Sequence, residues 1–247
     1  MNKEGGAVRR VGRWIMAWIA AAVMGVLLAG AGTVPAAPIG IEGALLRGRT
    51  IVIDPGHGGY DPGAKGRIAR EDQVNLAVSL ALRQWFEAAG ARVVLTWDEP
   101  GKIPPNRKYR VQQRVAWINQ TEGNVLIDIH CNSAGPRWRG PQTFYWDGKG
   151  SYHLAHDVQE ELQYFTNTRR RVTRIDQYVL RHAQMPAINV EVGFITNRKE
   201  ERLLVDPAYQ RKLAWYIFLG TERWFLKGRW PEKLLQAPPP THLLVRD

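Results

Sequence analysis

The sequence is poor in cysteine and in acidic residues, and it contains no internal repeat. Its single cysteine, Cys131, excludes an intramolecular disulfide and a Cys-rich structural zinc site. The motif His-Glu-x-x-His is also absent, which argues against the zinc peptidases built on that helix. The 247 residues are 45% hydrophobic and include ten Trp, so the chain suits one well-buried domain with extensions.

The N-terminal segment differs from the rest of the chain. Three arginines, Arg9, Arg10 and Arg13, precede an uncharged run over residues 14–41. Charge followed by an apolar stretch and small residues is typical of an export signal, and the run is also long enough to span a bilayer. The flanking arginines disfavour a buried helix. We therefore expect an exported protein in which residues 1–48 form a signal peptide or a membrane anchor plus linker.

The shortage of acidic residues gives a net charge of +11. Residues 1–48 carry five basic and two acidic groups, so the remainder keeps 29 against 21, a charge of +8. An exported basic domain suits an anionic polymer. Nucleic acid is disfavoured because the basic residues are scattered and no known binding motif accompanies them. We interpret the densest group, residues 169–171 with Arg174, as a solvated face.

From Arg49 onward, strand and helix patterns alternate. Short β-branched runs predict strands, apolar residues three and four apart predict helices, and weak alternation over residues 142–146 predicts an edge strand. The strands are expected at 50–53, 92–96, 125–129 and 187–192, and the helices at 72–89, 109–119, 152–165 and 207–225. This order predicts an α/β single domain with a mostly parallel sheet covered by helices on both faces. Residues 228–247 are predicted to form a Pro-containing tail.

Three candidate metal ligands lie at or near the ends of these elements. His57 follows the first strand, Glu71 opens the first long helix, and His130 ends the central strand. Ligands of open α/β sheets bind beyond the carboxyl ends of the strands, so the three side chains can converge there. Two imidazoles and one carboxylate are a common catalytic zinc set, which leaves a fourth position for water. Taken singly each signal is weak, since a glutamate at a helix start is usually a dipole partner.

Glu191 is the candidate catalytic group. It lies inside an apolar strand, where a carboxylate is costly unless it has a partner. Near zinc it can act as general base towards the metal-bound water and then pass the proton to the leaving amine. The alternative is a structural glutamate paired with an arginine or a backbone turn. Asn132, just beyond His130, is a candidate substrate-binding residue or a turn residue.

Other polar and aromatic residues have weaker patterns. His153 and His156 lie three apart on a predicted helix, and we expect a polar helix face there rather than a metal site. The side chain of Cys131 alternates with that of His130, so it should point away from the metal. Three aromatic residues, Trp138, Tyr145 and Trp146, can bind glycan as an exposed platform, or they can pack in the core or at the edge of the sheet.

Six ordered motifs surround these candidates. They are Ile53-Asp54-Pro55-Gly56-His57-Gly58-Gly59, Glu71-Asp72-x-x-Asn75-Leu76, Gly90-Ala91-x-Val93-Val94-Leu95-Thr96, Arg114-Val115-x-x-Ile118-Asn119, Asp128-Ile129-His130-Cys131-Asn132, and Pro186-Ala187-x-x-x-Glu191-Val192-Gly193-Phe194-Ile195-x-Asn197. Over residues 49–227 the chain thus resembles the catalytic domain of the zinc-dependent N-acetylmuramoyl-L-alanine amidases. The resemblance implies that His57, Glu71 and His130 hold one zinc ion and that Glu191 is catalytic. It also implies hydrolysis of the amide between muramic acid and L-alanine in peptidoglycan. The family commonly has an arginine where this chain has Trp97.

The resemblance extends to one subgroup. Only 60 residues separate His130 from Glu191, which leaves little room for the inserted blocking helix of the cell-division amidases. An N-terminal membrane segment before a bare catalytic domain looks most like the sporulation amidase that prepares muramic δ-lactam in the spore cortex. That likeness implies a polysaccharide deacetylase as a functional partner. A vegetative autolysin is the alternative role within the same family.

The residues alone are also compatible with three functions outside the family. Another zinc hydrolase, such as a wall peptidase or a deacetylase, shares the metal chemistry and differs in the bond cut. A non-catalytic peptidoglycan-binding protein needs none of the four candidate residues. A cysteine hydrolase would use Cys131 and would be inactivated by thiol alkylation rather than by chelators.

Overall fold

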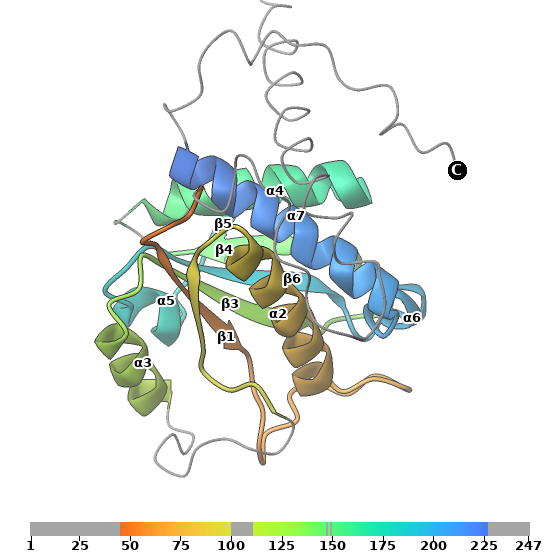
Figure 1. Cartoon of the computed structure of the whole chain (residues 1–247). Helices are drawn as coiled ribbons and strands as arrows, with labels where there is room; N and C mark the ends of the chain where they lie inside the picture. Colours follow the sequence, from red (N-terminus) through yellow and green to blue (C-terminus); the bar gives the residue numbers. More distant parts are fainter. Residues whose placement is uncertain (1–44, 100–110, 147, 149, 227–247) are drawn as a thin grey trace, which may run out of the picture.

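The computed structural model describes residues 45–99, 111–146, 148 and 150–226 (Figure 1). Its helices and strands follow one another as β1 (Thr50–Pro55), α2 (Glu71–Ala88), β2 (Arg92–Leu95), α3 (Val111–Gln120), β3 (Val125–Asn132), β4 (Gln142–Tyr145), α4 (Ser151–Thr166), β5 (Thr173–Arg174), α5 (Tyr178–His182), β6 (Ala187–Phe194), α6 (Arg198–Leu204) and α7 (Pro207–Leu226). The predicted signal or anchor, up to residue 44, and the predicted C-terminal tail lie outside the described residues. Within the described part, no helix is both long and apolar enough to cross a bilayer.

Six strands form one sheet in the order β2-β1-β3-β6-β4-β5. β1 pairs in parallel with β2 and β3, and β3 pairs in parallel with β6. β4 runs antiparallel to β6, and β5 is parallel to β4. The mostly parallel α/β sheet predicted from the sequence is therefore confirmed.

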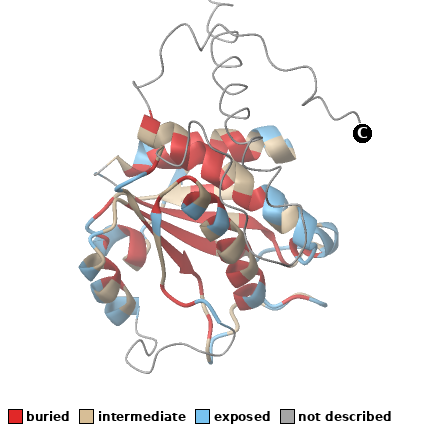
Figure 2. Cartoon of the chain, in the orientation of Figure 1, coloured by how far each residue is buried: buried red, intermediate tan, exposed pale blue. Residues whose placement is uncertain are grey.

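Helices cover both faces of this sheet, and its three central strands β1, β3 and β6 are almost entirely buried (Figures 1 and 2). Alternate residues of β1 face opposite sides: Ile51 and Ile53 pack with α2, α4 and α7, whereas Val52 packs with α3 and α5. The same alternation in β3 places Ile127 on the first side and Leu126 on the second. Two apolar layers thus hold the strands in register, and the carboxyl ends of β1, β3 and β6 meet at one rim.

Short elements account for the differences from prediction. β4 is not an edge strand, because the two-residue β5 pairs with its outer side. Both residues of β5 are exposed, so no hydrophobic alternation marks them. α5 and α6 were not predicted either, since five and seven residues are too few to show a helical period.

α7 and α4 are joined by charged groups inside their contact. Arg223 donates to Glu161 at 2.9 Å and to Glu160 at 2.8 Å. The neighbouring Glu222 is 1% exposed, and its Oε2 has no hydrogen-bond partner among the described residues. Burial raises the pKa of Glu222 to about 8. A protonated carboxyl is therefore the form that the folded protein favours at this position.

We expect Glu222→Gln to remove a pH-dependent destabilisation. In the unfolded chain the glutamate ionises near its ordinary pKa of 4.5, whereas the folded protein keeps the proton up to about 8. Stability from this group is thus complete below pH 4.5 and is lost as the pH rises through about 8. The variant should match wild type at pH 4.5 and exceed it by about 3 kcal/mol at pH 9 in urea unfolding. Equal stabilities at both pH values would contradict this.

Candidate metal centre

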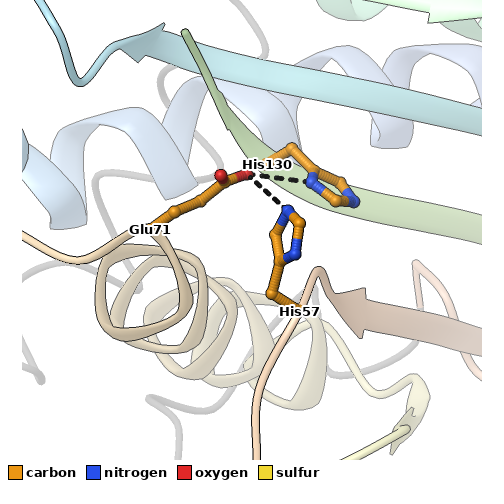
Figure 3. A group of neighbouring side chains, drawn as sticks. All are labelled: His57, Glu71 and His130. Atoms are coloured by element: carbon orange, nitrogen blue, oxygen red, sulfur yellow. Dashed lines mark hydrogen bonds and ion pairs between the residues drawn. The ribbon is translucent and has the colours of Figure 1, made fainter. Parts of the chain in front are cut away.

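Three segments bring His57, Glu71 and His130 together at the rim of the sheet (Figure 3). His57 comes from the loop after β1, Glu71 from the first residue of α2, and His130 from the end of β3. Glu71 Oε1 lies 3.0 Å from His130 Nδ1 and 3.2 Å from His57 Nε2. One donor atom from each residue lies within 4.8 Å of the other two. The structure thus brings the predicted ligand trio to one point.

A second carboxylate lies next to the outer nitrogen of each histidine, in a hydrogen bond to His57 and at ion-pair distance from His130. Asp61 Oδ2 lies 2.7 Å from His57 Nδ1, and Asp128 Oδ1 lies 3.2 Å from His130 Nε2. Such carboxylates fix the tautomer and orientation of a metal-binding imidazole. The remaining nitrogens, His57 Nε2 and His130 Nδ1, both face Glu71. Neither aspartate was predicted to have a role, although Asp128 lies two residues before His130 and so on the same face of β3.

The Glu71 carboxylate is held by backbone as well as by imidazoles. The N–H of Ala64 donates to Oε2 at 2.7 Å, and the N–H of Cys131 donates to Oε1 at 3.1 Å. Burial opposes ionisation of this carboxyl, but the hydrogen bonds from His130, His57 and Ala64 outweigh it and lower the pKa of Glu71. Glu71 is therefore a fixed anion at neutral pH.

The pKa values of the two histidines shift upwards, opposite to that of Glu71. Burial disfavours their charged forms, but the surrounding carboxylates outweigh it. Glu71 and Asp61 raise the pKa of His57, and Asp128 and Glu71 raise the pKa of His130. The carboxylates thus surround the two imidazoles with negative charge, which favours a positive charge between them, carried by protons or by a metal ion.

Two glycines leave room for this arrangement. A Cβ on Gly56 would lie 2.2 Å from Cε1 of His130, and one on Gly63 would lie 2.6 Å from Glu71 Oε2. His57 itself has a φ of 63°, an uncommon backbone conformation for a non-glycine residue. Arg114 stabilises that conformation, because its Nη2 donates to the carbonyl of His57 at 3.1 Å.

A buried polar network supports the loop from below. Asp54 is fully buried and accepts a hydrogen bond from Thr96, and Arg114 lies 3.4 Å from its Oδ2. Burial raises the pKa of Asp54, and the charge of Arg114 opposes the rise. Trp97, which stands where the family commonly has an arginine, is buried and donates from Nε1 to the carbonyl of Pro55 at 2.7 Å. Trp97 thus fixes the end of β1.

Glu191 lies beside the trio on the next strand. It is the register partner of His130 in the parallel pair of β3 and β6, so the two side chains leave the same face of the sheet. The register shifts between His130 and Asn132, a bulge of the kind that occurs next to active sites. The Oε2 of Glu191 is buried and lacks a hydrogen-bond partner among the described residues. Burial raises the pKa of Glu191 to about 7.

This donor set fits a divalent metal. Two imidazole nitrogens and a carboxylate oxygen converge, carboxylates hold the outer nitrogens, and an orphaned buried carboxylate oxygen lies alongside. Zinc prefers this mixture of nitrogen and oxygen ligands, whereas magnesium and calcium prefer oxygen alone.

The other candidates next to the trio differ in exposure. Cys131 is 3% exposed in the hydrophobic core, and burial raises the pKa of its thiol well above the ordinary value. A thiol in that state is a poor nucleophile. Asn132 is half-buried, and its carbonyl accepts the N–H of Ile195 at 2.9 Å.

A second group of potential ligands consists of His156, Asp157 and Glu160 on α4. Arg223 of α7 already occupies it, with Nη2 at 3.5 Å from Asp157 Oδ1 and 2.8 Å from Glu160 Oε2. His153 is exposed and is not part of this group. The predicted polar face of this helix therefore carries an ion-pair network between α4 and α7.

The aromatic and arginine candidates pack against each other. Arg170 lies over the rings of Trp138 and Phe194, at 5.1 and 4.4 Å from their centroids, and Arg174 lies 4.1 Å from that of Trp146. Trp138 nevertheless remains 57% exposed, whereas Trp146 packs against the second core cluster. Arg170 and Arg174 are thus partly engaged by aromatic rings, which the expectation of a solvated face did not include.

The chain is similar to known proteins over most of its described residues. Residues 51–223 match the family model described as N-acetylmuramoyl-L-alanine amidase. The chain is 37% identical over 201 residues to the germination-specific N-acetylmuramoyl-L-alanine amidase of Bacillus subtilis, across 76% of this chain and 84% of that protein. Among solved structures, the CwlD amidase of Clostridioides difficile in complex with the GerS lipoprotein is 35% identical with a TM-score of 0.65, covering 71% of this chain and 98% of that one. The amidase AmiC2 of Nostoc punctiforme is 31% identical with a TM-score of 0.63, covering 70% and 94%.

The family match spans the whole sheet and every residue of the metal centre. A relative more than 30% identical over three quarters of the chain supports it independently. The chain therefore belongs to the N-acetylmuramoyl-L-alanine amidases, enzymes that act on bacterial peptidoglycan.

Proposed function

We propose that this amidase is zinc-dependent and hydrolyses the amide between N-acetylmuramic acid and L-alanine with one zinc ion held by His57, Glu71 and His130. The observation that carries the proposal is the convergence of these three donors, with Asp61 and Asp128 behind the two imidazoles. Zinc in this position supplies a Lewis acid that polarises the amide carbonyl and lowers the pKa of a water molecule.

Glu191 is the proposed general base. Its buried Oε2 is available to accept a proton from the attacking water, and its pKa of about 7 allows it to give that proton up again. The proton then passes to the nitrogen of L-alanine as the amide bond breaks. A carboxyl whose pKa lies near neutrality serves both steps, because it is neither too weak a base nor too weak an acid.

Asn132 is the proposed substrate-binding residue. It follows His130 at the end of β3, so its amide lies at the same rim as the metal centre. A side-chain amide can donate to a carbonyl of the glycan or the stem peptide and accept from its N–H.

The biological role that we propose is maturation of the spore cortex, where removal of the stem peptide precedes formation of muramic δ-lactam. The similarity to a germination-specific amidase of Bacillus subtilis supports this role over that of a vegetative autolysin. A polysaccharide deacetylase would complete the lactam. The related CwlD amidase was solved with the GerS lipoprotein, and a lipoprotein is therefore a second kind of partner to test.

Spores that lack this enzyme should contain no muramic δ-lactam when their digested cortex is analysed by chromatography.

We also propose that residues 1–48 carry the chain out of the cytoplasm, that residues 49–227 form the zinc amidase domain and that residues 228–247 are a tail. The positive charge before an uncharged run supports export, and the family match over residues 51–223 supports the extent of the domain.

Chelation of zinc and alkylation of the Cys131 thiol distinguish the proposed zinc enzyme from a cysteine hydrolase. A zinc chelator should abolish release of stem peptides, and one equivalent of zinc should restore it, whereas a thiol alkylating agent should leave the rate unchanged because Cys131 is buried. Metal analysis should find one zinc per chain in wild type and none in His130→Ala. Inactivation by alkylation with indifference to chelators would support the cysteine hydrolase instead.

Glu191→Gln should lower kcat by about 10²–10⁴-fold, because the amide keeps the shape of the glutamate but cannot accept the proton. Its zinc content should stay at the wild-type level, since Glu191 is not one of the three ligands. Glu222→Gln is the control: this glutamate also has a raised pKa and a buried, unpartnered oxygen among the described residues, but it lies in α7. If Glu191→Gln is as active as Glu222→Gln, Glu191 is not the general base.

Asp61→Asn should weaken zinc binding by about 10–100-fold in competition with a chromogenic chelator. The amide can still accept the N–H of Gly63, which now donates to Oδ1 at 3.0 Å, but it presents a donor to His57 Nδ1. Asp176→Asn, an exposed aspartate paired with Arg181, serves as control. Equal zinc affinity in the two variants would show that Asp61 does not orient His57.

A further inference from the structure

A cleft of about 630 Å³ lies between segments that follow along the chain from those of the metal centre. One wall comes from the loop before α2, a second from the loop between β3 and β4, and the third from the end of β6 and the start of α6. Six basic side chains line it, namely Lys65, Arg67, Arg137, Arg139, Arg198 and Lys199. All six are exposed, and none forms an ion pair within the described part of the chain.

The two acidic residues of the lining are hydrogen-bonded to backbone amides and offset only part of this charge. Glu200 accepts the N–H of Gly140 at 2.7 Å and that of Phe194 at 2.8 Å. Glu201 accepts the N–H of Ile68 at 2.7 Å and is 4% exposed. Both carboxylates thus accept hydrogen bonds from backbone amides, and these hydrogen bonds connect the three walls of the cleft. Arg139 interacts with Glu200 by charge, so the six basic and two acidic side chains leave the lining with a net charge of six minus two, or +4.

The walls continue directly from the segments that hold the metal ligands. Ala64, whose N–H binds the Glu71 carboxylate, is followed at once by Lys65. On the other side Ile195, which lines the cleft, donates its N–H to the carbonyl of Asn132. Two chain segments that contact the metal centre or the end of its central strand therefore continue directly into the walls of the cleft.

We propose that this cleft binds the free carboxylates of the peptidoglycan stem peptide and so selects substrates that carry them. The proposal rests on the proposed function, because it takes the muramoyl–L-alanine amide as the scissile bond. The second residue of the stem is a glutamate joined through its side chain, so its α-carboxylate remains free unless it is amidated. Arginine and lysine bind such carboxylates by charge-assisted hydrogen bonds.

A phosphate-rich wall polymer is the competing anionic ligand for a basic surface. The position of the cleft favours the stem peptide, because a subsite that continues from the ligand-bearing loops acts on the part of the substrate attached to the scissile amide. A polymer that merely tethers the enzyme needs no such continuity with the metal centre.

The test uses zinc-loaded enzyme and two synthetic muramoyl peptides that differ only at the second residue, which carries a free α-carboxylate in one and an amide in the other. Wild type should show about a tenfold higher kcat/KM for the carboxylate. This preference should shrink when the salt concentration is raised from about 0.05 M to about 0.5 M.

The cleft variant combines Lys65→Gln, Arg67→Gln, Arg198→Gln and Lys199→Gln. It should cleave the two peptides equally, with turnover of the amidated peptide at the wild-type level, which also shows that it is folded. The matched control replaces four exposed basic residues outside the cleft, with Arg47→Gln, Arg202→Gln, Arg211→Gln and Lys212→Gln, and it should keep the preference.

Equal cleavage of both peptides by wild type, or a preference that survives in the cleft variant, would overturn the inference. So would a cleft variant that keeps its preference but no longer sediments with teichoic-acid-bearing walls, because the cleft would then hold a phosphate polymer. An enzyme that cleaves neither peptide would instead contradict the proposed function itself.

Discussion

The Glu71 carboxylate joins the parts of this molecule that make it an enzyme. Its two oxygens contact both histidines and accept backbone N–H groups from Ala64 and Cys131. One side chain at the start of α2 thereby fixes the loop after β1 and the end of β3. A buried carboxylate is stable only with such partners, so the same contacts that stabilise the fold also shape the metal centre. The proposed zinc ion would add positive charge to this group of carboxylates.

The parallel register of β1, β3 and β6 supplies the second constraint. It places His130 next to Glu191 and Asp54 next to Asp128, so ligand, proposed base and supporting carboxylates share one rim. Acidic groups surround the two histidines, whereas six exposed basic side chains line the cleft between the loops at residues 65 and 137.

Much of this arrangement is readable from the sequence because it depends on local patterns. Short β-branched runs predicted the main strands, and the convergence of His57, Glu71 and His130 was expected from their places at element ends. What the sequence alone does not reveal depends on contacts distant along the chain. Glu201 ties the loop at residue 68 to α6, and Arg170 stacks on Trp138, without any periodic signal. Short elements such as β5 carry too few residues to form a pattern.

The central claim is that this chain cuts the bond between muramic acid and L-alanine. Mass spectrometry of purified, spore-type peptidoglycan digested with the zinc-loaded enzyme tests it most directly. The account predicts free stem peptides that begin with L-alanine, together with glycan strands whose muramic acid carries an unsubstituted lactyl group. Stem peptides that stay attached to the glycan but become shorter would contradict it, because the enzyme would then be a peptidase.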